Sequence, residues 1–382
     1  MDTNCNRREF FARLAQSACG LGVCRLLSPV TVLAREEIPP VEASFYKKLP
    51  DAKVRCEVCP KECEIADLER GYCGNKENRK GVYYTLVYGR CCSAHIDPIE
   101  KKPLFHYLPS SEAFSIAAAG CNFECKFCQN WNIAQFRPEQ VDDFYLPPAK
   151  VVSLAKEKKC PTIAFTYSEP VVFYEYMRDT ALQARREGIG SVMISNGYIN
   201  EAPLAELCRH LTGVKIDLKG FSEKFYKEYC SGELKPVLDT LKRLSRIGIW
   251  YEIVVLLIPT LNDDRDEIRQ MCRWIKAELG VEVPLHFTRF HPMYKIQNLP
   301  STPVKTLEEA RIIARETGLN YAYLGNVPGH EGENTYCPKC NEVVIGRVGF
   351  HIIKNGLKKG ACPTCGHRIP GVWERGIVGV IA

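Results

Sequence analysis

The middle of the chain alternates short β-forming runs with amphipathic helical patterns. Helical patterns occur at 174–187, ending at Gly188, and at 238–247, where leucine and isoleucine recur at spacings of three before Gly248. Between such patterns lie six apolar runs, each the length of a strand buried on both faces: 113–119, 162–167, 191–195, 213–218, 251–258 and 284–289. This order predicts an α/β fold with a parallel sheet, either open and doubly wound or closed into a full or partial barrel. We expect active residues at the carboxyl ends of its strands.

The length of the chain predicts one large catalytic domain with smaller appendages. At 382 residues it exceeds the ~250–300 residues at which a single hydrophobic core stops growing. We expect a leader or tail with a linker at 1–45, a four-cysteine module at 46–110, the core domain at 111–330 and a second four-cysteine module, shaped as a ribbon, at 331–382.

The composition predicts a globular protein without a membrane span. Hydrophobic residues make up 46% of the chain and charged residues 25%. No apolar run approaches the ~20 residues that a spanning helix requires. The net charge of +6 is mild and the basic residues are scattered, so nucleic-acid binding is not indicated.

Two arginines near the N-terminus leave the compartment open. Arg7 and Arg8, in the stretch NRREFF at 6–11, resemble a twin-arginine export signal. Arg13 and Arg25 interrupt the apolar stretch that should follow, however, and no A-x-A cleavage site comes after it. An amphipathic terminal helix explains the same residues. We expect a cytoplasmic protein, with export by the twin-arginine route as the alternative.

Cysteine is unusually abundant, with 20 residues, of which 11 fall in three spaced clusters. Disulfide frameworks of that density belong to small secreted domains that lack a core, whereas this chain has ample apolar residues. The clusters therefore indicate metal binding. The remaining cysteines are interpreted mostly as small buried hydrophobes.

One cluster comes directly after the first predicted strand and consists of Cys121, Cys125 and Cys128. Gly120 and Asn122 suit the tight turn by which a short loop wraps three ligands around a compact object. Three thiolates can hold three corners of a 4Fe-4S cluster and leave the fourth iron open, whereas electron carriers close all four corners with cysteine. The alternatives are a zinc site with a distant fourth ligand and three structural cysteines.

This loop, with the aromatic Phe127 before its last cysteine, resembles the signature of the radical S-adenosylmethionine superfamily. The resemblance implies a partial (β/α)6 barrel in which S-adenosyl-L-methionine binds the open iron through its amino and carboxylate groups. It also implies that an electron from the reduced cluster cleaves this cofactor, and that the resulting 5′-deoxyadenosyl radical abstracts hydrogen from a substrate. The protein then supplies orientation and a dry cavity.

Glu169, in the stretch TYSEP, follows the second predicted strand and places a carboxylate beside the expected cluster. Such an acid needs a partner, and the ammonium group of the bound methionine moiety is a suitable one. The position resembles the Gly-Gly-Glu motif of the superfamily, although Tyr167 and Ser168 replace both glycines. The alternative is a helix-capping or turn role.

Polar residues also end the later strands. The resemblance to glycyl-radical-enzyme activases implies cofactor contacts for Ser195, Asn196, Asp217, Lys219 and His291. Alternation along a strand puts Asp217 and Lys219 on one face, where they can share a ligand or simply pair with each other. A lone histidine such as His291 is often structural.

Four cysteines near the C-terminus have the spacing of a zinc ribbon. Two C-x2-C pairs are separated by 21 residues and are each followed by Asn341 or Gly366, which suit a left-handed backbone. A structural zinc site is favoured over a rubredoxin-like iron site, and its ligands are Cys337, Cys340, Cys362 and Cys365.

A third cluster lies before the predicted core and has a less regular pitch. It can hold zinc or an auxiliary iron–sulfur cluster, and zinc is favoured slightly. Its ligands are Cys56, Cys59, Cys63 and Cys73.

The order of these parts resembles the AmmeMemoRadiSam-system radical enzymes, relatives of pyruvate formate-lyase activating enzyme. The resemblance covers about 50–376 and rests on CEVCPKEC, RGYCGNKENRKG, DPIEKKPLFH, AAAGCNFECKFCQNWNIAQ, KIDLKGF and NTYCPKC. It implies a protein substrate, possibly left with a glycyl radical, and a reductant such as flavodoxin or ferredoxin. Radical chemistry on a small molecule or nucleic acid is an alternative, as is a non-catalytic iron–sulfur electron carrier or metal-handling protein.

Overall fold

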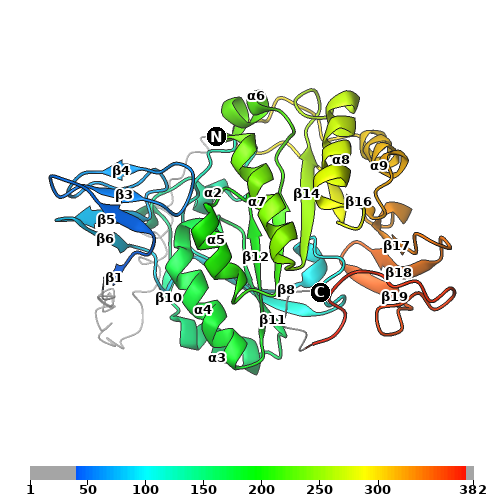
Figure 1. Ribbon diagram of the computed structural model, residues 1–382, viewed down its shortest axis with the longest axis horizontal. Helices are drawn as coiled ribbons and strands as arrows, with labels where there is room; N and C mark the ends of the chain where they lie inside the picture. Colours follow the sequence, from blue (N-terminus) through cyan, green and yellow to red (C-terminus); the bar gives the residue numbers. More distant parts are fainter. Residues whose placement is uncertain (1–39, 376–382) are drawn as a thin grey trace, which may run out of the picture. The chain divides into compact units, whose positions relative to one another are not determined.

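The computed structural model describes residues 40–375, and its centre is an eight-stranded sheet (Figure 1). Seven neighbouring strands are parallel, and β8 adds to one edge in the antiparallel direction. The predicted α/β fold with a parallel sheet is therefore confirmed. In spatial order the strands are β8 (Ser93–Pro98), β9 (Glu112–Ala117), β11 (Thr162–Phe165), β12 (Gly190–Ser195), β13 (Gly213–Asp217), β14 (Tyr251–Leu257), β15 (Leu285–Arg289) and β16 (Ala322–Gly325).

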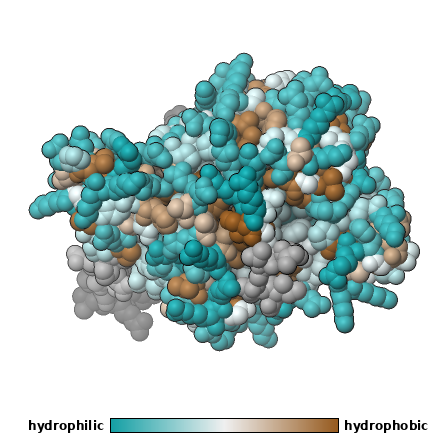
Figure 2. Space-filling model, viewed as in Figure 1, coloured by the Kyte–Doolittle hydropathy of each residue, from teal (hydrophilic) through white to brown (hydrophobic). Residues whose placement is uncertain are grey.

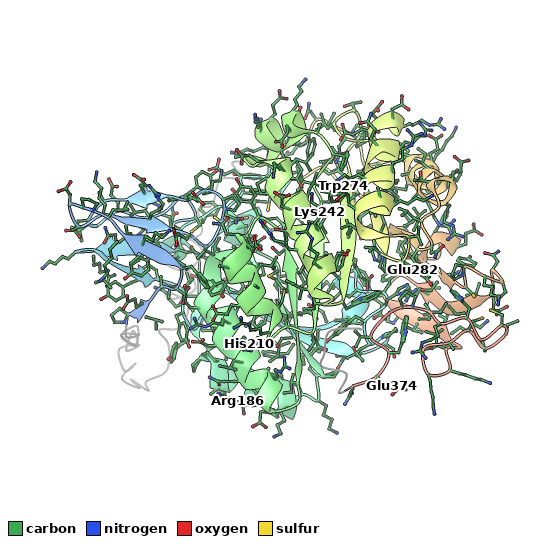
Figure 3. The ribbon with its side chains drawn as sticks, viewed as in Figure 1. Arg186, His210, Lys242, Trp274, Glu282 and Glu374 are labelled. Atoms are coloured by element: carbon green, nitrogen blue, oxygen red, sulfur yellow. The ribbon has the colours of Figure 1, made fainter. Side chains whose placement is uncertain are left out.

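Helices follow the strands along the chain and cover the outer face of the sheet (Figure 1). The helix predicted around 238–247 ends at Gly248, whose φ of 76° is the left-handed conformation that glycine adopts without strain. Figure 3 shows Lys242 on α7 near α8, where its Nζ lies 3.8 Å from Glu278 Oε2. The main helices are α3 (Pro148–Glu157), α4 (Tyr174–Arg186), α5 (Glu201–Cys208), α7 (Leu234–Ile247), α8 (Arg265–Leu279) and α9 (Val304–Thr317).

Short helical segments shape the loops at the ends of the strands. They are α2 (Trp131–Ala134), α6 (Glu223–Phe225), the 3-10 helices η1 (Ile99–Lys101), η2 (Pro138–Gln140), η3 (Pro170–Phe173) and η5 (Glu331–Glu333), and the π-helix η4 (Tyr226–Cys230).

All six predicted strands occur, and their apolar side chains form the main core. Val214, Ile216, Ile253 and Leu285 are fully buried between the helices and the interior of the sheet. Burial on both faces explains why these strands read as continuous apolar runs rather than as alternating ones. The edge strand β8 and the short strand β16 were not predicted, because neither forms a run of that kind.

Two small β modules lie beside the sheet, one from each end of the described chain (Figure 1). The N-terminal module has two three-stranded sheets, and β7 pairs with β10 next to it. The C-terminal module is a three-stranded antiparallel ribbon of β17 (Thr335–Tyr336), β18 (Val343–Val348) and β19 (His351–Asn355). The remaining strands are β1 (Val41–Glu42), β2 (Tyr46–Lys48), β3 (Val54–Cys56), β4 (Glu64–Ile65), β5 (Lys76–Arg79), β6 (Val82–Thr85), β7 (Arg90–Cys91) and β10 (Phe144–Tyr145).

Buried charged side chains attach both modules to the core. Lys76 of β5 pairs with Glu175 of α4 at 2.7 Å, with both side chains almost completely buried. Arg347 of β18 donates to Phe105 O at 2.8 Å and to Glu333 O at 3.1 Å. Because an uncompensated buried charge is costly, each pairing fixes its module in one position.

Polar and charged residues cover most of the face seen in Figure 2, with apolar residues in scattered patches. Within residues 40–375 we find no helix with the length and apolarity needed to cross a bilayer. The twin-arginine motif lies outside the described residues. Localisation and the predicted domain boundaries remain predictions.

Candidate functional site

A cavity of about 470 Å³ opens at the carboxyl ends of the parallel strands. Side chains from the loops after β9, β11, β12 and β13 line it together, as expected for a sheet of this kind. The predicted site residues among them are Cys121, Cys125, Cys128, Glu169, Asn196, Asp217 and Lys219.

The cysteine loop begins three residues after β9 and makes a turn that requires glycine. Gly120 has a φ of 96°, and a Cβ placed there would lie 2.5 Å from Asn75 Oδ1. Asn122 fixes the turn by donating from Nδ2 to Tyr198 O at 2.9 Å. Backbone hydrogen bonds of 2.9 Å, from Glu124 N to Cys230 O and from Lys126 N to Tyr229 O, hold the middle of the loop.

A fourth cysteine, Cys230, lies beside this loop and was not predicted as part of the site. Its thiol is fully buried and hydrogen-bonds Cys125, which lowers the pKa of Cys125 despite the opposing effect of burial. Burial raises the pKa of Cys230 well above its usual value. Cys230 is not among the described residues that line the cavity. It supports Cys125 from behind, as outer partners of metal ligands do.

Glu169 is buried at the end of β11 and joins this strand to β12. Its Oε1 accepts from Ser195 Oγ at 2.7 Å and from Val171 N at 3.1 Å, and its Oε2 accepts from Asn196 N at 2.8 Å. Burial raises its pKa to about 7, and the hydrogen bonds from Asn196 and Ser195 only partly offset this effect. The carboxylate caps η3, as one reading of the sequence expected, and it also lines the cavity.

Tyr167 occupies a backbone position that favours glycine. Its φ is 66°, which is uncommon for a bulky residue. The side chain is held in place because its hydroxyl donates to Asp97 and Lys102 Nζ lies 4.4 Å from the ring centroid. These contacts explain how tyrosine replaces the first glycine of the motif without loss of the turn.

Asp217 forms a charged cluster at the end of β13 with two lysines. Its carboxylate contacts Lys215 Nζ and lies 3.2 Å from Lys219 Nζ. Burial works against the charges, but the two lysines lower the pKa of Asp217 below its ordinary value. Lys215 was not among the predicted site residues. Alternate positions of one strand share a face, so the sequence does predict that Lys215 can contact Asp217.

His291 lies apart from the other predicted residues. Its side chain is exposed, and Nδ1 lies 2.9 Å from Ser301 Oγ. Among the described residues that line the cavity, Thr288 and Asn326 come from the neighbouring strand ends, but His291 is absent. Its role as a cofactor contact remains a prediction.

The three cavity cysteines fit a polynuclear cluster better than a single ion. Among residues 40–375 one group of cysteine, histidine or acidic side chains brings its ligand atoms within 4.8 Å of one another, and the cavity cysteines are not that group. In a cubane each thiolate binds a different iron, so wider spacing is expected.

Comparison with known proteins agrees with this donor set. The family model of the radical SAM superfamily matches residues 115–275. An uncharacterized protein of Methanocaldococcus jannaschii is 48% identical over 86% of this chain and 98% of its own length. The chain belongs to the radical SAM superfamily.

Relatives with assigned activities are more distant. The pyruvate formate-lyase-activating enzyme of Clostridium pasteurianum is 24% identical over 43% of this chain and 69% of its own length. A solved domain of the pyruvate-formate lyase-activating enzyme from Bacteroides vulgatus covers 43% of this chain and 98% of its own, with 19% identity and a TM-score of 0.38. The match to the radical SAM family model and the sequence homology to activating enzymes identify this radical SAM protein as an enzyme, and its family implies a 4Fe-4S cluster and S-adenosylmethionine.

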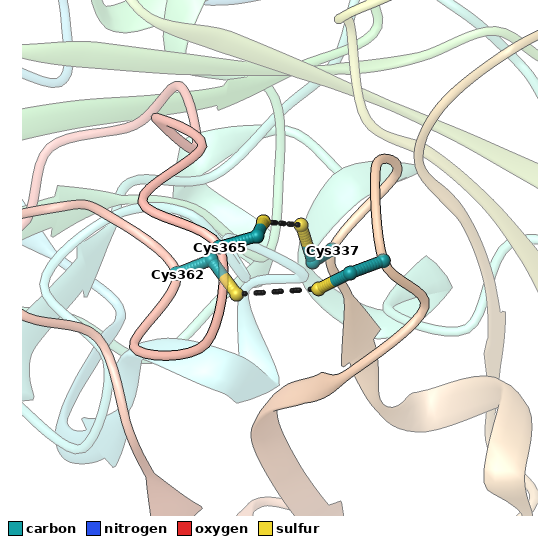
Figure 4. Close-up of side chains that lie close together, drawn as sticks. Cys337, Cys362 and Cys365 are labelled. Atoms are coloured by element: carbon teal, nitrogen blue, oxygen red, sulfur yellow. Dashed lines mark hydrogen bonds between the residues drawn. The ribbon is translucent and has the colours of Figure 1, made fainter.

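The ribbon of this radical SAM enzyme carries the group of converging thiols (Figure 4). The Sγ atoms of Cys337 and Cys365 are 3.6 Å apart, as are those of Cys340 and Cys362. Thiolates around one tetrahedral zinc, each at ~2.3 Å, stand about 3.8 Å apart. The left-handed backbone predicted after each pair occurs at Asn341 (φ 59°) and Gly366 (φ 70°).

Replacing Cys125 and Cys230 separately tests which of the two neighbours is a ligand. We expect Cys125→Ala to lose about four iron atoms per chain relative to the wild type, and Cys230→Ala to lose none. Because Cys230→Ala removes a hydrogen bond to a ligating sulfur, its cluster should have a lower reduction potential. Iron analysis and a redox titration followed by electron paramagnetic resonance measure both effects. Equal loss of iron in the two variants would identify Cys230 as a fourth ligand.

The raised pKa of Glu169 predicts a pH-dependent stability that Glu169→Gln removes. The folded carboxyl binds its proton more tightly than the unfolded one, so its contribution is complete below pH 4.5 and is lost as the pH rises through about 7. The free energy of unfolding should fall by about 3 kcal/mol more in the wild type than in the variant between pH 4.5 and 8. Urea unfolding of the cluster-free protein at both pH values measures this. Parallel pH profiles would contradict the assignment.

Removing one ribbon cysteine tests the structural metal site. Cys340→Ala should release one zinc per chain and lower the melting temperature, because the ion links the two ends of the ribbon. Metal analysis by mass spectrometry and a thermal melt provide the measurements. The half-buried Cys208 gives a matched control, Cys208→Ala, which should keep its zinc. Iron at the wild-type ribbon would favour the rubredoxin-like alternative instead.

Proposed function

We propose that this chain holds a 4Fe-4S cluster through Cys121, Cys125 and Cys128 and reductively cleaves S-adenosylmethionine beside it. The resulting 5′-deoxyadenosyl radical abstracts hydrogen from a substrate protein. The observation that carries this proposal is the cavity in which these three cysteines meet Glu169, Asp217 and other polar strand-end residues. When bound, the cluster supplies one electron to the cofactor.

Glu169 is suited to receive the ammonium group of S-adenosylmethionine. One donor already occupies Oε2, which leaves an acceptor site on a carboxylate that can accept about four hydrogen bonds. A cation at this buried position stabilises the ionised carboxylate, whose pKa burial has raised to about 7. Cofactor binding should therefore displace a proton from Glu169.

Asn196, Asp217 and Lys219 are suited to orient the rest of the cofactor. Asn196 Nδ2 donates to Asn122 Oδ1 at 2.7 Å, so the amide already has a fixed direction next to the cysteine loop. The Asp217 carboxylate and the Lys219 ammonium offer an acceptor and a donor for hydroxyl or carboxylate groups. The apolar side chains of Ile194, Val254 and Leu256 line the same cavity and exclude water from a reactive radical.

Homology to activating enzymes supports a protein as the substrate. It also supports a low-potential flavodoxin or ferredoxin as the electron donor. The ribbon then holds a structural zinc through Cys337, Cys340, Cys362 and Cys365, and its hairpin residue Phe350 lines the cavity. A substrate chain that enters there meets both the core and the ribbon.

Anaerobic turnover tests this function. The reconstituted, dithionite-reduced enzyme should convert S-adenosylmethionine to 5′-deoxyadenosine and methionine, which chromatography quantifies. Cys128→Ala should lower the rate of 5′-deoxyadenosine formation at least a hundredfold because it removes one of the three proposed cluster ligands. Cys208→Ala should leave the rate unchanged. No product from a fully loaded wild-type cluster would favour an electron carrier.

The class of substrate is tested in the same assay with a deuterated cell extract that has been separated by size. Deuterium in 5′-deoxyadenosine from the protein fraction, lost after protease treatment, supports a protein substrate. Deuterium in 5′-deoxyadenosine from the small-molecule fraction identifies a small-molecule substrate. Deuterium transfer that is lost after nuclease treatment identifies a nucleic-acid substrate.

A further inference from the structure

The four half-buried cysteines of the N-terminal module, Cys56, Cys59, Cys63 and Cys73, are neighbours in the structure. Cys56 lies at the end of β3, and its backbone N donates to Cys63 O at 3.0 Å. Tyr72 N donates to Cys63 Sγ at 3.4 Å, a backbone contact of the kind that iron–sulfur ligands receive. Tyr83, which is 1% exposed, has Cys56, Cys63 and Cys73 as electrostatic neighbours.

These thiols do not converge in the manner of a single-ion site. The ribbon thiols lie within 4.8 Å of one another, which matches one tetrahedral zinc. Neither the N-terminal set nor the three cysteines of the radical SAM loop forms such a group among the described residues. In this respect the N-terminal thiols resemble the three cysteines of the radical SAM loop and differ from the ribbon thiols.

The surroundings of this set suit a cluster that carries net negative charge. Lys76, whose side chain is 2% exposed, has Cys56 and Cys73 as electrostatic neighbours and pairs with Glu175. Four thiolates with a cubane of charge +2 leave a net charge of −2, and the ammonium of the buried Lys76–Glu175 pair is a positive group next to it. The backbone approaches closely at Gly71, where an added Cβ would lie 2.8 Å from Tyr83 Oη and 3.9 Å from Cys63 Cβ.

This set lies directly against the cysteine loop of the radical SAM site. Asn122 hydrogen-bonds the Cys59 thiol on one side and accepts from Asn196 on the other. Asn75 Nδ2 donates to Ala119 O at 2.5 Å, and Cys73 and Cys121 line one cavity of about 690 Å³. Asn122, which follows Cys121 in the sequence, thus links Cys59 of the N-terminal set to the loop that carries Cys121.

We propose that Cys56, Cys59, Cys63 and Cys73 hold a second 4Fe-4S cluster, fully ligated by cysteine, that relays electrons to the first. A reduced flavodoxin or ferredoxin gives it one electron, which lowers the cluster from the +2 to the +1 state. The same electron then passes to the first cluster, and no bond forms or breaks. The relay rests on the proposed function, whereas the identity of the second cluster does not.

A variant without the first cluster tests the identity of the second. Cys121, Cys125 and Cys128 are replaced together by alanine, and the protein is reconstituted without oxygen. We expect about four iron and four sulfide per chain and, after reduction, a paramagnetic signal that S-adenosylmethionine leaves unchanged. Mössbauer spectra distinguish cubane iron from a single ion in the ribbon. Zinc in place of this iron, or no metal, would overturn the proposal.

The wild-type chain gives an independent measure if that variant fails to fold. It should contain about eight cubane iron atoms, and Cys59→Ala should lose about four of them while Cys92→Ala loses none. A wild-type content of about four iron would equally overturn the proposal.

The relay is tested with Cys59→Ala and two reductants. Dithionite is small enough to reach the first cluster through the open cavity, so 5′-deoxyadenosine should form at the wild-type rate. Reduced flavodoxin should give a rate at least tenfold lower than the wild type, and Cys92→Ala should show no such difference. Equal rates with both reductants would refute the relay. If the wild type forms no product at all, the proposed function has failed, but the iron content still decides the second cluster.

Discussion

The buried carboxylate of Glu169 is the interaction on which the site depends. It holds the ends of β11 and β12 together through Ser195 and the backbone of Asn196. Asn196 then donates to Asn122, which fixes the turn of the cysteine loop. A buried carboxylate without donors would cost several kcal/mol, so these contacts are coupled and the strand ends have one arrangement. The position of the three thiols follows from this network rather than from the loop alone.

Two lysines contact one aspartate in each of two charged clusters at the cavity. Asp217 is shared by Lys215 and Lys219, while Asp97 is shared by Lys101 and Lys102. Each cluster carries a net positive charge before any ligand binds. Glu169 has no such basic partner at hydrogen-bonding distance among the described residues, which is why burial raises its pKa to about 7. The cavity thus presents excess positive charge around one acid that can ionise when a cation approaches.

The sequence predicted the parallel sheet and most of the strand-end residues, because both depend on local patterns. Apolar runs and their carboxyl ends are visible along the chain. Cys230 was missed, since its contact with Cys125 arises when a π-helix over 100 residues later returns to the loop. Lys215 carries an alternation signal that was overlooked. Tyr167 departs from the glycine motif, and its left-handed backbone depends on contacts with Asp97 and Lys102 that no local pattern encodes.

The three cysteine sets show that sequence spacing and thiol geometry carry different information. C-x2-C occurs in the ribbon, in the radical SAM loop (Cys125 to Cys128) and in the N-terminal module (Cys56 to Cys59). Among the described residues, the sulfurs of paired C-x2-C motifs come within 4.8 Å of one another only in the ribbon. One knuckle of the ribbon lies between β17 and β18 and the other follows β19, whereas the cysteines of the other two sets lie mostly in loops. Convergence of the sulfurs therefore depends on the elements that carry the cysteines and not on the C-x2-C spacing alone.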